Sequence, residues 1–361
     1  MLNAMVKELI LRKNEISEPV ETIYFGGGTP SLLTIDELQL LIDTVYQNYP
    51  IIDNPEITLE ANPDDLSQLS FRTSQTEGLT QVRNLYDAYR QLGINRLSIG
   101  IQSFFEEDLQ FMNRAHTAHE ALNCLKEATQ YFDNITVDLI YGIPNLSTEK
   151  WRENLQMVFD LGINHLSGYA LTVEPKTALA NFINAGKYPP LDEALALEHF
   201  NILVEESKKQ NFIQYEISNF GKENYFSKHN TAYWQGKPYL GIGPSAHSFN
   251  GKTRSWNVSN NALYLKSIAQ NELPSESETL SKEELFNETI MTGLRTIWGV
   301  DLNKIESDFG IIYKTQLLKQ AEKHIRQGTL EIILDKKTSI LKITQKGLFL
   351  SDGIAADLFV L

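Results

Sequence analysis

Short apolar segments alternate with longer amphipathic segments along the first two thirds of the chain. The short segments are typical of buried strands, and the apolar spacing of the longer ones is typical of helices. Strands that alternate with helices form βαβ units, and therefore a parallel sheet with right-handed crossovers. We expect strands at 22–25, 56–60, 96–101, 135–140, 165–171 and 215–218, and helices at 35–46, 79–92, 120–132, 150–161 and 194–210.

Two near-identical segments, 92–98 and 161–167, support this alternation. Each carries a glycine, Gly93 or Gly162, at the point where an expected helix gives way to an expected strand. Glycine is favoured just after a helix because it adopts left-handed backbone angles without strain. The polar, turn-rich segment 67–78 has no such pattern and is predicted to be a surface insertion.

Polar side chains stand at the carboxyl ends of six expected strands. A (β/α) barrel gathers one site from many strand ends, whereas an open sheet concentrates its site at one switch point. We therefore predict an α/β fold with a partial parallel (β/α) barrel. The polar residues are Thr29, Glu60, Asn62, Gln102, Ser103, Asp138, Tyr169, Thr172, Glu174, Glu216, Ser218 and Asn219.

Two of these strand ends carry further information. Asp138 interrupts an apolar strand, and a buried carboxylate requires a partner. Three glycines, Gly26, Gly27 and Gly28, follow the first strand. Without Cβ atoms this backbone can pass close to a bound molecule and offer it free N–H groups. A ligand site between the first strand and the helix that follows it is the expected result.

Charge and cysteine content exclude several classes of function. The chain has 32 basic and 46 acidic side chains, a net charge of −14, which disfavours a nucleic acid or an anionic membrane as partner. It has no run of eighteen apolar residues, so we expect no integral membrane segment and a cytoplasmic protein. Cys124 is the only cysteine and is expected to be a buried residue on a helix. Alone it cannot hold an iron–sulfur cluster.

Five motifs, taken in order, resemble the radical S-adenosylmethionine proteins of the oxygen-independent coproporphyrinogen oxidase family. They are GGGTP at 26–30, EANP at 60–63, GIQSF at 100–104, NRAH at 113–116 and DLIYGIP at 138–144. The resemblance implies that Gly27, Gly28 and Thr29 bind the methionine end of S-adenosylmethionine. It implies that the same cofactor is contacted by Glu60, Gln102, Arg114 and Asp138. This ligand needs hydrogen-bond acceptors, a cationic partner and an approachable backbone, which these residues offer.

The sequence departs from the family ahead of the glycine segment. Family members carry a Cys-x-x-x-Cys-x-x-Cys motif there that holds a [4Fe–4S] cluster, and this motif is absent from the 361 residues. Residues 1–13 resemble the helix that follows the cluster loop. A start codon assigned too late and removal of the front of the protein are favoured, because a sheet that starts here has an uncovered edge. A natural remnant without a cluster is the third explanation. Radical chemistry is not expected from this chain as written.

A further motif distinguishes branches of the family. His229, Asn230 and Tyr233 are similar to the haem-binding signature of its haem-chaperone branch, which implies haem as a ligand and haem-acceptor proteins as partners. A neutral imidazole is a good axial ligand, so His229 is the expected ligand of the haem iron. A lone loop histidine that only forms hydrogen bonds is the alternative interpretation. For the whole protein the alternative is oxidative decarboxylation of coproporphyrinogen III in porphyrin biosynthesis.

The pattern changes near residue 262. We expect a first domain at 1–262, with a truncated barrel and the haem motif, and a second at 263–361. Segment 271–278 is predicted to be a linker. Helices at 283–295, 302–309 and 314–327 and a hairpin of 330–334 with 339–343 resemble the winged-helix-like carboxyl-terminal domain of the family. Residues 275–361 hold eleven basic and thirteen acidic side chains, which favours packing over nucleic-acid binding.

Overall fold

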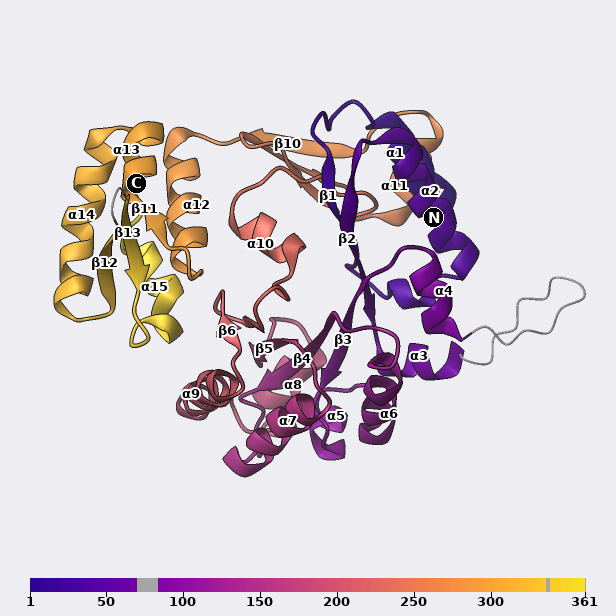
Figure 1. Ribbon diagram of the computed structural model, residues 1–361, viewed down its shortest axis with the longest axis horizontal. Coiled ribbons are helices and arrows are strands. Elements are labelled where there is room, and N and C mark those ends of the chain that lie inside the picture. The colour runs from indigo at the N-terminus through magenta and orange to yellow at the C-terminus, as the bar shows by residue number, and fades with distance from the viewer. Residues whose placement is uncertain (70–83, 336–337, 361) are drawn as a thin grey trace, which may run out of the picture.

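The computed structural model describes residues 1–69, 84–335 and 338–360, and in these residues strands alternate with helices as predicted. Five parallel strands pair in chain order and start a curved sheet that forms a partial barrel (Figure 1). They are β1 (Val20–Phe25), β2 (Ile51–Ala61), β3 (Arg96–Gln102), β4 (Ile135–Tyr141) and β5 (His165–Ala170). The strands β7 (Asn219–Gly221) and β6 (Ile213–Gln214) extend the sheet beyond β5.

The prediction of a sixth strand at 215–218 is wrong. This segment turns the chain between β6 and β7, and β7 runs antiparallel to both β5 and β6. The Glu216 carboxylate stabilises the turn, because it accepts hydrogen bonds from the Ser218 N–H at 2.9 Å and the Asn219 side-chain amide at 2.5 Å. The sheet therefore consists of five parallel strands followed by an antiparallel pair.

The connecting helices bury one face of the sheet. Apolar side chains on alternate positions of the strands, such as Ile57 and Leu59 on β2, form one core with helix residues such as Leu38 and Leu125. The helices of this part are α1 (Leu2–Leu11), α2 (Ile35–Asn48), α3 (Pro63–Leu69), α4 (Leu85–Gln91), α5 (Glu106–Phe111), α6 (Ala118–Ala128), α7 (Thr148–Asp160), α8 (Ala178–Asn184) and α9 (Glu193–Lys209), with a 3-10 turn η1 (Pro30–Leu32).

Local signals fix several of these boundaries. Gly93 and Gly162 have φ angles of 86° and 71°, which confirms their predicted role after helices. The helix predicted at 79–92 is described as α4, which follows Asn84, and the Asn84 side chain accepts the Tyr86 N–H. The first part of that helix, 79–83, lies outside the described residues. So does most of the predicted insertion 67–78, whose first three residues end α3.

The opposite face of the sheet is polar. The residues of β2 that alternate with the apolar ones are Glu56, Thr58 and Glu60, and they point into the barrel. The short helix α10 (Lys228–Trp234) lies on this inner side and contacts β1. Figure 1 shows α10 between the sheet and the carboxyl-terminal domain. The fold thus places the haem motif beside the polar inner face.

A small antiparallel sheet connects the barrel to the carboxyl-terminal part. It contains β8 (His247–Phe249), β9 (Thr253–Asn257) and β10 (Ser275–Thr279). The linker predicted at 271–278 is therefore wrong over the residues of β10, which pair with β9. Helix α11 (Asn261–Ala269) packs against α1. The domain boundary after residue 262 stays a prediction.

The carboxyl-terminal part has its own apolar core and contains the predicted helices and hairpin. A short strand β11 that the sequence did not predict also pairs with β13. None of the described helices has both the length and the apolar character that a bilayer crossing requires. The elements are α12 (Lys282–Leu294), β11 (Val300–Asp301), α13 (Leu302–Phe309), α14 (Ile311–Arg326), β12 (Leu330–Asp335), β13 (Thr338–Ile343), η2 (Leu348–Leu350) and α15 (Ser351–Ala356).

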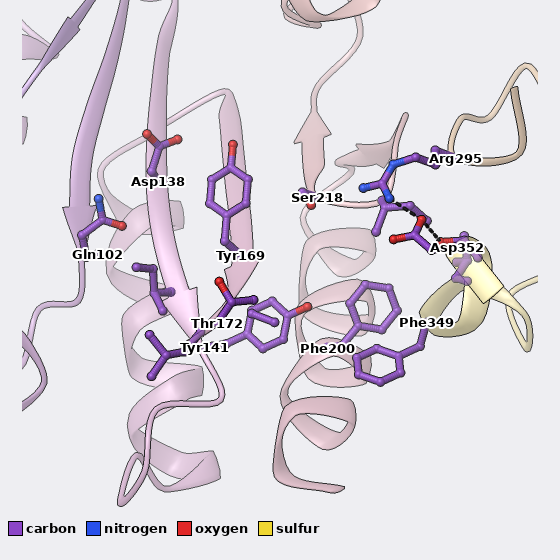
Figure 2. Close-up of a pocket in the computed structure, with 16 residues that line it drawn as sticks. Gln102, Asp138, Tyr141, Tyr169, Thr172, Phe200, Ser218, Arg295, Phe349 and Asp352 are labelled. Atoms are coloured by element: carbon purple, nitrogen blue, oxygen red, sulfur yellow. Dashed lines mark hydrogen bonds and ion pairs between the residues drawn. The ribbon is translucent and has the colours of Figure 1, made fainter. Parts of the chain in front are cut away.

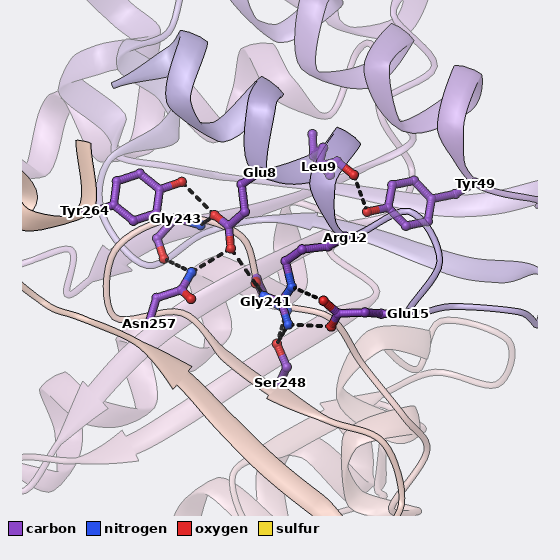
Figure 3. A network of polar contacts seen from close by, with 10 residues as sticks. All are labelled: Glu8, Leu9, Arg12, Glu15, Tyr49, Gly241, Gly243, Ser248, Asn257 and Tyr264. Carbon is purple, nitrogen blue, oxygen red and sulfur yellow. Dashed lines mark hydrogen bonds and ion pairs between the residues drawn. The ribbon is translucent and has the colours of Figure 1, made fainter. Parts of the chain in front are cut away.

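A buried carboxylate holds α1 against the segment that follows α10 (Figure 3). Glu8 is fully buried and pairs with Arg12 at 3.2 Å. It also accepts hydrogen bonds from the Tyr264 hydroxyl at 2.6 Å, the Asn257 amide at 2.7 Å and the Gly243 N–H at 2.8 Å. Arg12, one turn away, and three donors from a distant part of the chain thus depend on one side chain.

We predict that Glu8→Ala destabilises the protein by about 3–5 kcal/mol, because it leaves buried donors without an acceptor. Glu15→Ala is the matched control. Glu15 pairs with the same Arg12 but is 43% exposed, so we expect a loss of about 1 kcal/mol or less. Urea denaturation of the two variants measures both values. Equal losses would show that the Glu8 network does not hold α1.

Candidate functional site

The glycine segment packs against Glu60 at the carboxyl ends of β1 and β2. The Gly27 N–H donates to Glu60 Oε2 at 3.2 Å, and the Tyr24 hydroxyl donates to Glu60 Oε1 at 2.6 Å. A Cβ at Gly26 would lie 2.7 Å from Glu60 Oε1, so only glycine permits this approach. At Gly27 and Gly28 a Cβ would meet no atom of the described residues within 4 Å. The loop is therefore fixed on one side and open to a ligand on the other.

A second group of polar residues gathers over Gly100 at the end of β3. Arg114 Nη2 donates to Asn62 Oδ1 at 2.7 Å and to the Gly100 carbonyl at 3.2 Å. A Cβ at Gly100 would lie 2.9 Å from Gln102 Nε2. Arg114 Nε is buried and has no hydrogen-bond partner among the residues that the structure describes. A buried donor without a partner is costly, which suits a site whose ligand supplies the acceptor.

Asp138 lies on the inner face of β4, where its charge is poorly stabilised. Burial raises the pKa of Asp138 to about 6, and the negative charge of Glu60 adds to the rise. Polar interactions with Ser167 and Ser98 and the charge of Arg96 oppose the rise in this pKa. Asp138 can therefore exchange a proton near neutral pH.

A cavity of about 670 Å³ opens beside Asp138, between the barrel and the carboxyl-terminal domain (Figure 2). Gln102 and Asp138 lie on the barrel side, and the ion pair of Arg295 with Asp352, at 2.5 Å, lies on the opposite side. This volume is within the usual range for small-molecule sites. The apolar part of the lining includes Tyr141, Tyr169, Phe200 and Phe349.

His229 is held against the inner face of the sheet by three contacts. Its Nδ1 forms a hydrogen bond with Thr22 Oγ1 at 3.2 Å, and its backbone N–H donates to Glu56 Oε1 at 3.0 Å. Its ring stacks on the Tyr24 ring, with centroids 4.5 Å apart and planes inclined by 18°. Among the described residues none forms a hydrogen bond with Nε2. Burial lowers the pKa of His229, so the imidazole is neutral at neutral pH.

Comparison with known proteins identifies the family. Residues 2–158 match the Radical SAM superfamily, and residues 280–350 match the HemN C-terminal domain. The Heme chaperone HemW of Bacillus subtilis is 32% identical over 315 residues, which cover 86% of this chain and 79% of that protein. The chain belongs to the HemW-like branch of the radical S-adenosylmethionine family.

Other similar proteins agree with this assignment. The mitochondrial Radical S-adenosyl methionine domain-containing protein 1 of Dictyostelium discoideum is 33% identical over 393 residues, which cover 98% of this chain and 84% of that protein. The structure of coproporphyrinogen III oxidase (HemN) from Escherichia coli superposes with a TM-score of 0.79 at 21% identity, over 99% of this chain and 82% of that one. This second likeness concerns the fold alone.

The structure brings most of the predicted cofactor residues of this HemW-like chain together. Gly27 and Glu60 are in contact, Gln102 and Arg114 meet over Gly100, and the charge of Asp138 interacts with that of Glu60. Thr29 is exposed and precedes η1, and its side chain forms no capping hydrogen bond there. Roles of these residues toward S-adenosylmethionine stay predictions.

The haem-motif residues His229 and Tyr233 lie on successive turns of α10. His229 faces β1, as described above. Tyr233 is half exposed and packs against Tyr239 and Trp234, with ring centroids 5.4 and 5.6 Å away. The Asn230 N–H donates to the Ser227 hydroxyl at the start of the helix. The motif therefore forms one small helix with a largely buried histidine at its start and a half-exposed tyrosine one turn later.

Sequence reasoning missed two sets of residues. Tyr24 contacts both Glu60 and His229. It lies two positions before the glycine segment, and its side chain points to the inner face of β1. The alternation of side chains along the strand could have predicted this orientation. Arg295, Phe349 and Asp352 line the cavity from the carboxyl-terminal domain, and no local motif marks them.

The family implies a [4Fe–4S] cluster, and the one cysteine of this sequence does not fit it. Cys124 is buried on α6, as predicted, with its sulfur 3.9 Å from the Tyr86 hydroxyl. Burial raises the pKa of its thiol to about 12, which disfavours the thiolate that iron requires. The described residues contain no group of three or more histidine, cysteine or acidic side chains suited to a metal ion.

We predict that Asp138 makes stability depend on pH. Between its ordinary value of 3.8 and about 6, the folded protein holds a proton that the unfolded chain has released, so stability falls as pH rises through this window. Asp138→Asn should remove this slope and stabilise the protein at neutral pH by about 2 kcal/mol. Urea denaturation across the window measures both effects. The exposed Asp43→Asn serves as control, and identical pH profiles for the two variants would contradict the prediction.

Proposed function

We propose that this chain is a haem-binding protein of the chaperone type, in which His229 is the ligand of the haem iron. The geometry around His229 carries the proposal. Thr22 holds Nδ1 and leaves Nε2 without a protein partner among the described residues. A metal-binding histidine commonly has its second nitrogen fixed in this way, and the neutral ring is the form that binds iron.

The surroundings of His229 support haem as cargo. Tyr233, Tyr239 and Trp234 form an aromatic cluster near the end of α10, and aromatic faces suit a flat, apolar macrocycle. Similar bacterial proteins, among them those of Bacillus subtilis and Lactococcus lactis, are named heme chaperones HemW. A carrier passes its cargo on, so we infer that haem-acceptor proteins are the partners of this chain.

We further propose that the strand ends of the barrel bind S-adenosylmethionine. Gly27 and Gly28 offer an open backbone, and Glu60 and Asp138 offer carboxylates. Arg114 Nε forms no hydrogen bond within the described part of the chain. These groups match an amino group, ribose hydroxyls and a carboxylate. When bound, S-adenosylmethionine brings a cationic sulfonium into this acidic site. Thr29 and Gln102 complete the proposed contacts.

The alternative, oxidative decarboxylation of coproporphyrinogen III, has less support. It rests on likeness to HemN at 21% identity, which concerns the fold, whereas the HemW relatives are about 30% identical over most of their length. The reaction would also require the cluster that Cys124 does not fit. The carrier is therefore the function that the site supports best.

We predict that purified protein binds haem and that His229→Ala shifts the Soret band and weakens affinity at least tenfold, equivalent to about 1.4 kcal/mol. The reason is loss of the axial nitrogen. Haem titration followed by absorbance gives both values. His119→Ala, an exposed histidine on α6, is the control and should bind as wild type does. A spectrum and affinity unchanged in His229→Ala would exclude His229 as the ligand.

We also predict that Glu60→Gln weakens S-adenosylmethionine binding about tenfold, because a charge-assisted hydrogen bond becomes a neutral one. Equilibrium dialysis with labelled S-adenosylmethionine measures the affinity. Glu18→Gln, an exposed residue before β1, controls for the change in net charge. Equal affinities of the two variants would remove Glu60 from the proposed site.

A further inference from the structure

One residue touches both proposed sites. The Tyr24 hydroxyl donates to Glu60 Oε1 at 2.6 Å, and the face of the same ring stacks on His229 at 4.5 Å. A Cβ built on Gly26 would lie 2.4 Å from Tyr24 Cε1, so the backbone of the glycine segment closes a further side of the ring. Tyr24 is thus in contact with the glycine segment, the carboxylate and the histidine at once.

We propose that Tyr24 is a positioning residue that couples the state of the Glu60 carboxylate to the His229 imidazole. The inference rests on the proposed function for its meaning, since it links the S-adenosylmethionine site to the haem ligand. The contacts of Tyr24 with Glu60 and His229 form within this chain and require neither S-adenosylmethionine nor haem.

The coupling follows from the two contacts of the phenol. Burial and the charge of Glu60 both raise the pKa of Tyr24, so its hydroxyl keeps the proton and donates it to the carboxylate. A hydrogen bond to a charged acceptor is stronger than a neutral one and increases the electron density of the phenol ring. The His229 imidazole stacks on the face of this ring. The electronic environment of the imidazole therefore depends on the strength of the hydrogen bond from the Tyr24 hydroxyl to Glu60.

The charge of a ligand at Glu60 sets the direction of its effect on His229. A cationic amino group that binds Glu60 shares the carboxylate and weakens the Tyr24 bond. The ring then carries less electron density toward His229, and the imidazole becomes a poorer donor to iron. A ligand at the strand ends should therefore weaken haem binding, and by linkage haem should weaken that ligand equally. Stacked aromatic pairs interact only modestly, so the expected change in haem affinity is about threefold.

A double-substitution cycle in the haem-free protein tests the coupling. The full chain carries 15N-labelled histidine, and His229→Ala assigns the imidazole signals of His229. Glu60→Gln neutralises the carboxylate, and Tyr24→Phe removes the hydroxyl while it keeps the ring. We expect Glu60→Gln to displace the His229 signals clearly in the wild-type background and by less than half as much in Tyr24→Phe.

Two outcomes would overturn the proposal. One is an equal displacement in both backgrounds, which means that Glu60 acts on His229 only through space. The other is no displacement in either background. Tyr49→Phe is the matched control, because it also removes one tyrosine hydroxyl bond, to the Leu9 carbonyl at 2.8 Å. In Tyr49→Phe the effect of Glu60→Gln should be that of the wild-type background.

A haem titration separates this inference from the proposed function. Glu60→Gln should weaken haem binding about threefold in the wild-type background and leave it unchanged in Tyr24→Phe. If the wild-type protein binds no haem, the proposed function fails while the histidine signals still decide the coupling. If haem binds through His229 but the two substitutions act additively on its affinity, the coupling is wrong and the proposed function stands.

Discussion

The polar inner face of the sheet is the constraint on which this structure depends, because each carboxylate there needs donors that water would otherwise supply. Glu56 is 4% exposed, and the backbone N–H groups of Lys228 and His229 satisfy it at 3.0 Å each. A carboxylate at the start of a helix is favourable, since the unpaired N–H groups there carry partial positive charge. Glu56 therefore fixes where α10 begins, and with it the position of His229.

Backbone contacts of the turn at Glu216 link the barrel to the carboxyl-terminal domain. Glu216 turns the chain after β6 and forms a bridge with Thr296, and the Ile297 N–H donates to the Tyr215 carbonyl at 3.0 Å. Arg295 then lies over the Trp234 ring at 5.2 Å, at the end of α10. One short helix thus contacts the barrel through its first residues and the carboxyl-terminal domain through its last. The cavity beside Asp138 lies between these two parts.

Periodicity predicted the parallel strands because one face of each strand is apolar, as in Ile57 and Leu59. Periodicity predicted the wrong structure at 215–218 and over β10, where hydrogen bonds rather than burial determine the path of the backbone. Glu216 converts an apparent strand into a turn, and β10, whose residues are all exposed, forms a strand only because it pairs with β9. Motifs located the cofactor residues near one another. They gave no sign of Arg295, because its contact with the cavity depends on how a distant domain packs.

The four-residue spacing between His229 and Tyr233 determines how the two side chains lie on α10. His229 and Tyr233 are four residues apart, so in α10 they lie on neighbouring turns of one helix side. His229 is at the start of the helix, where Glu56 and Thr22 hold it, and Tyr233 stands one turn further toward solvent, among Tyr239 and Trp234. The imidazole is thereby oriented from within the barrel, while the aromatic surface that would meet a macrocycle stays accessible. Because Tyr24 contacts both His229 and Glu60, the proposed coupling between the strand ends and this histidine runs through a single side chain.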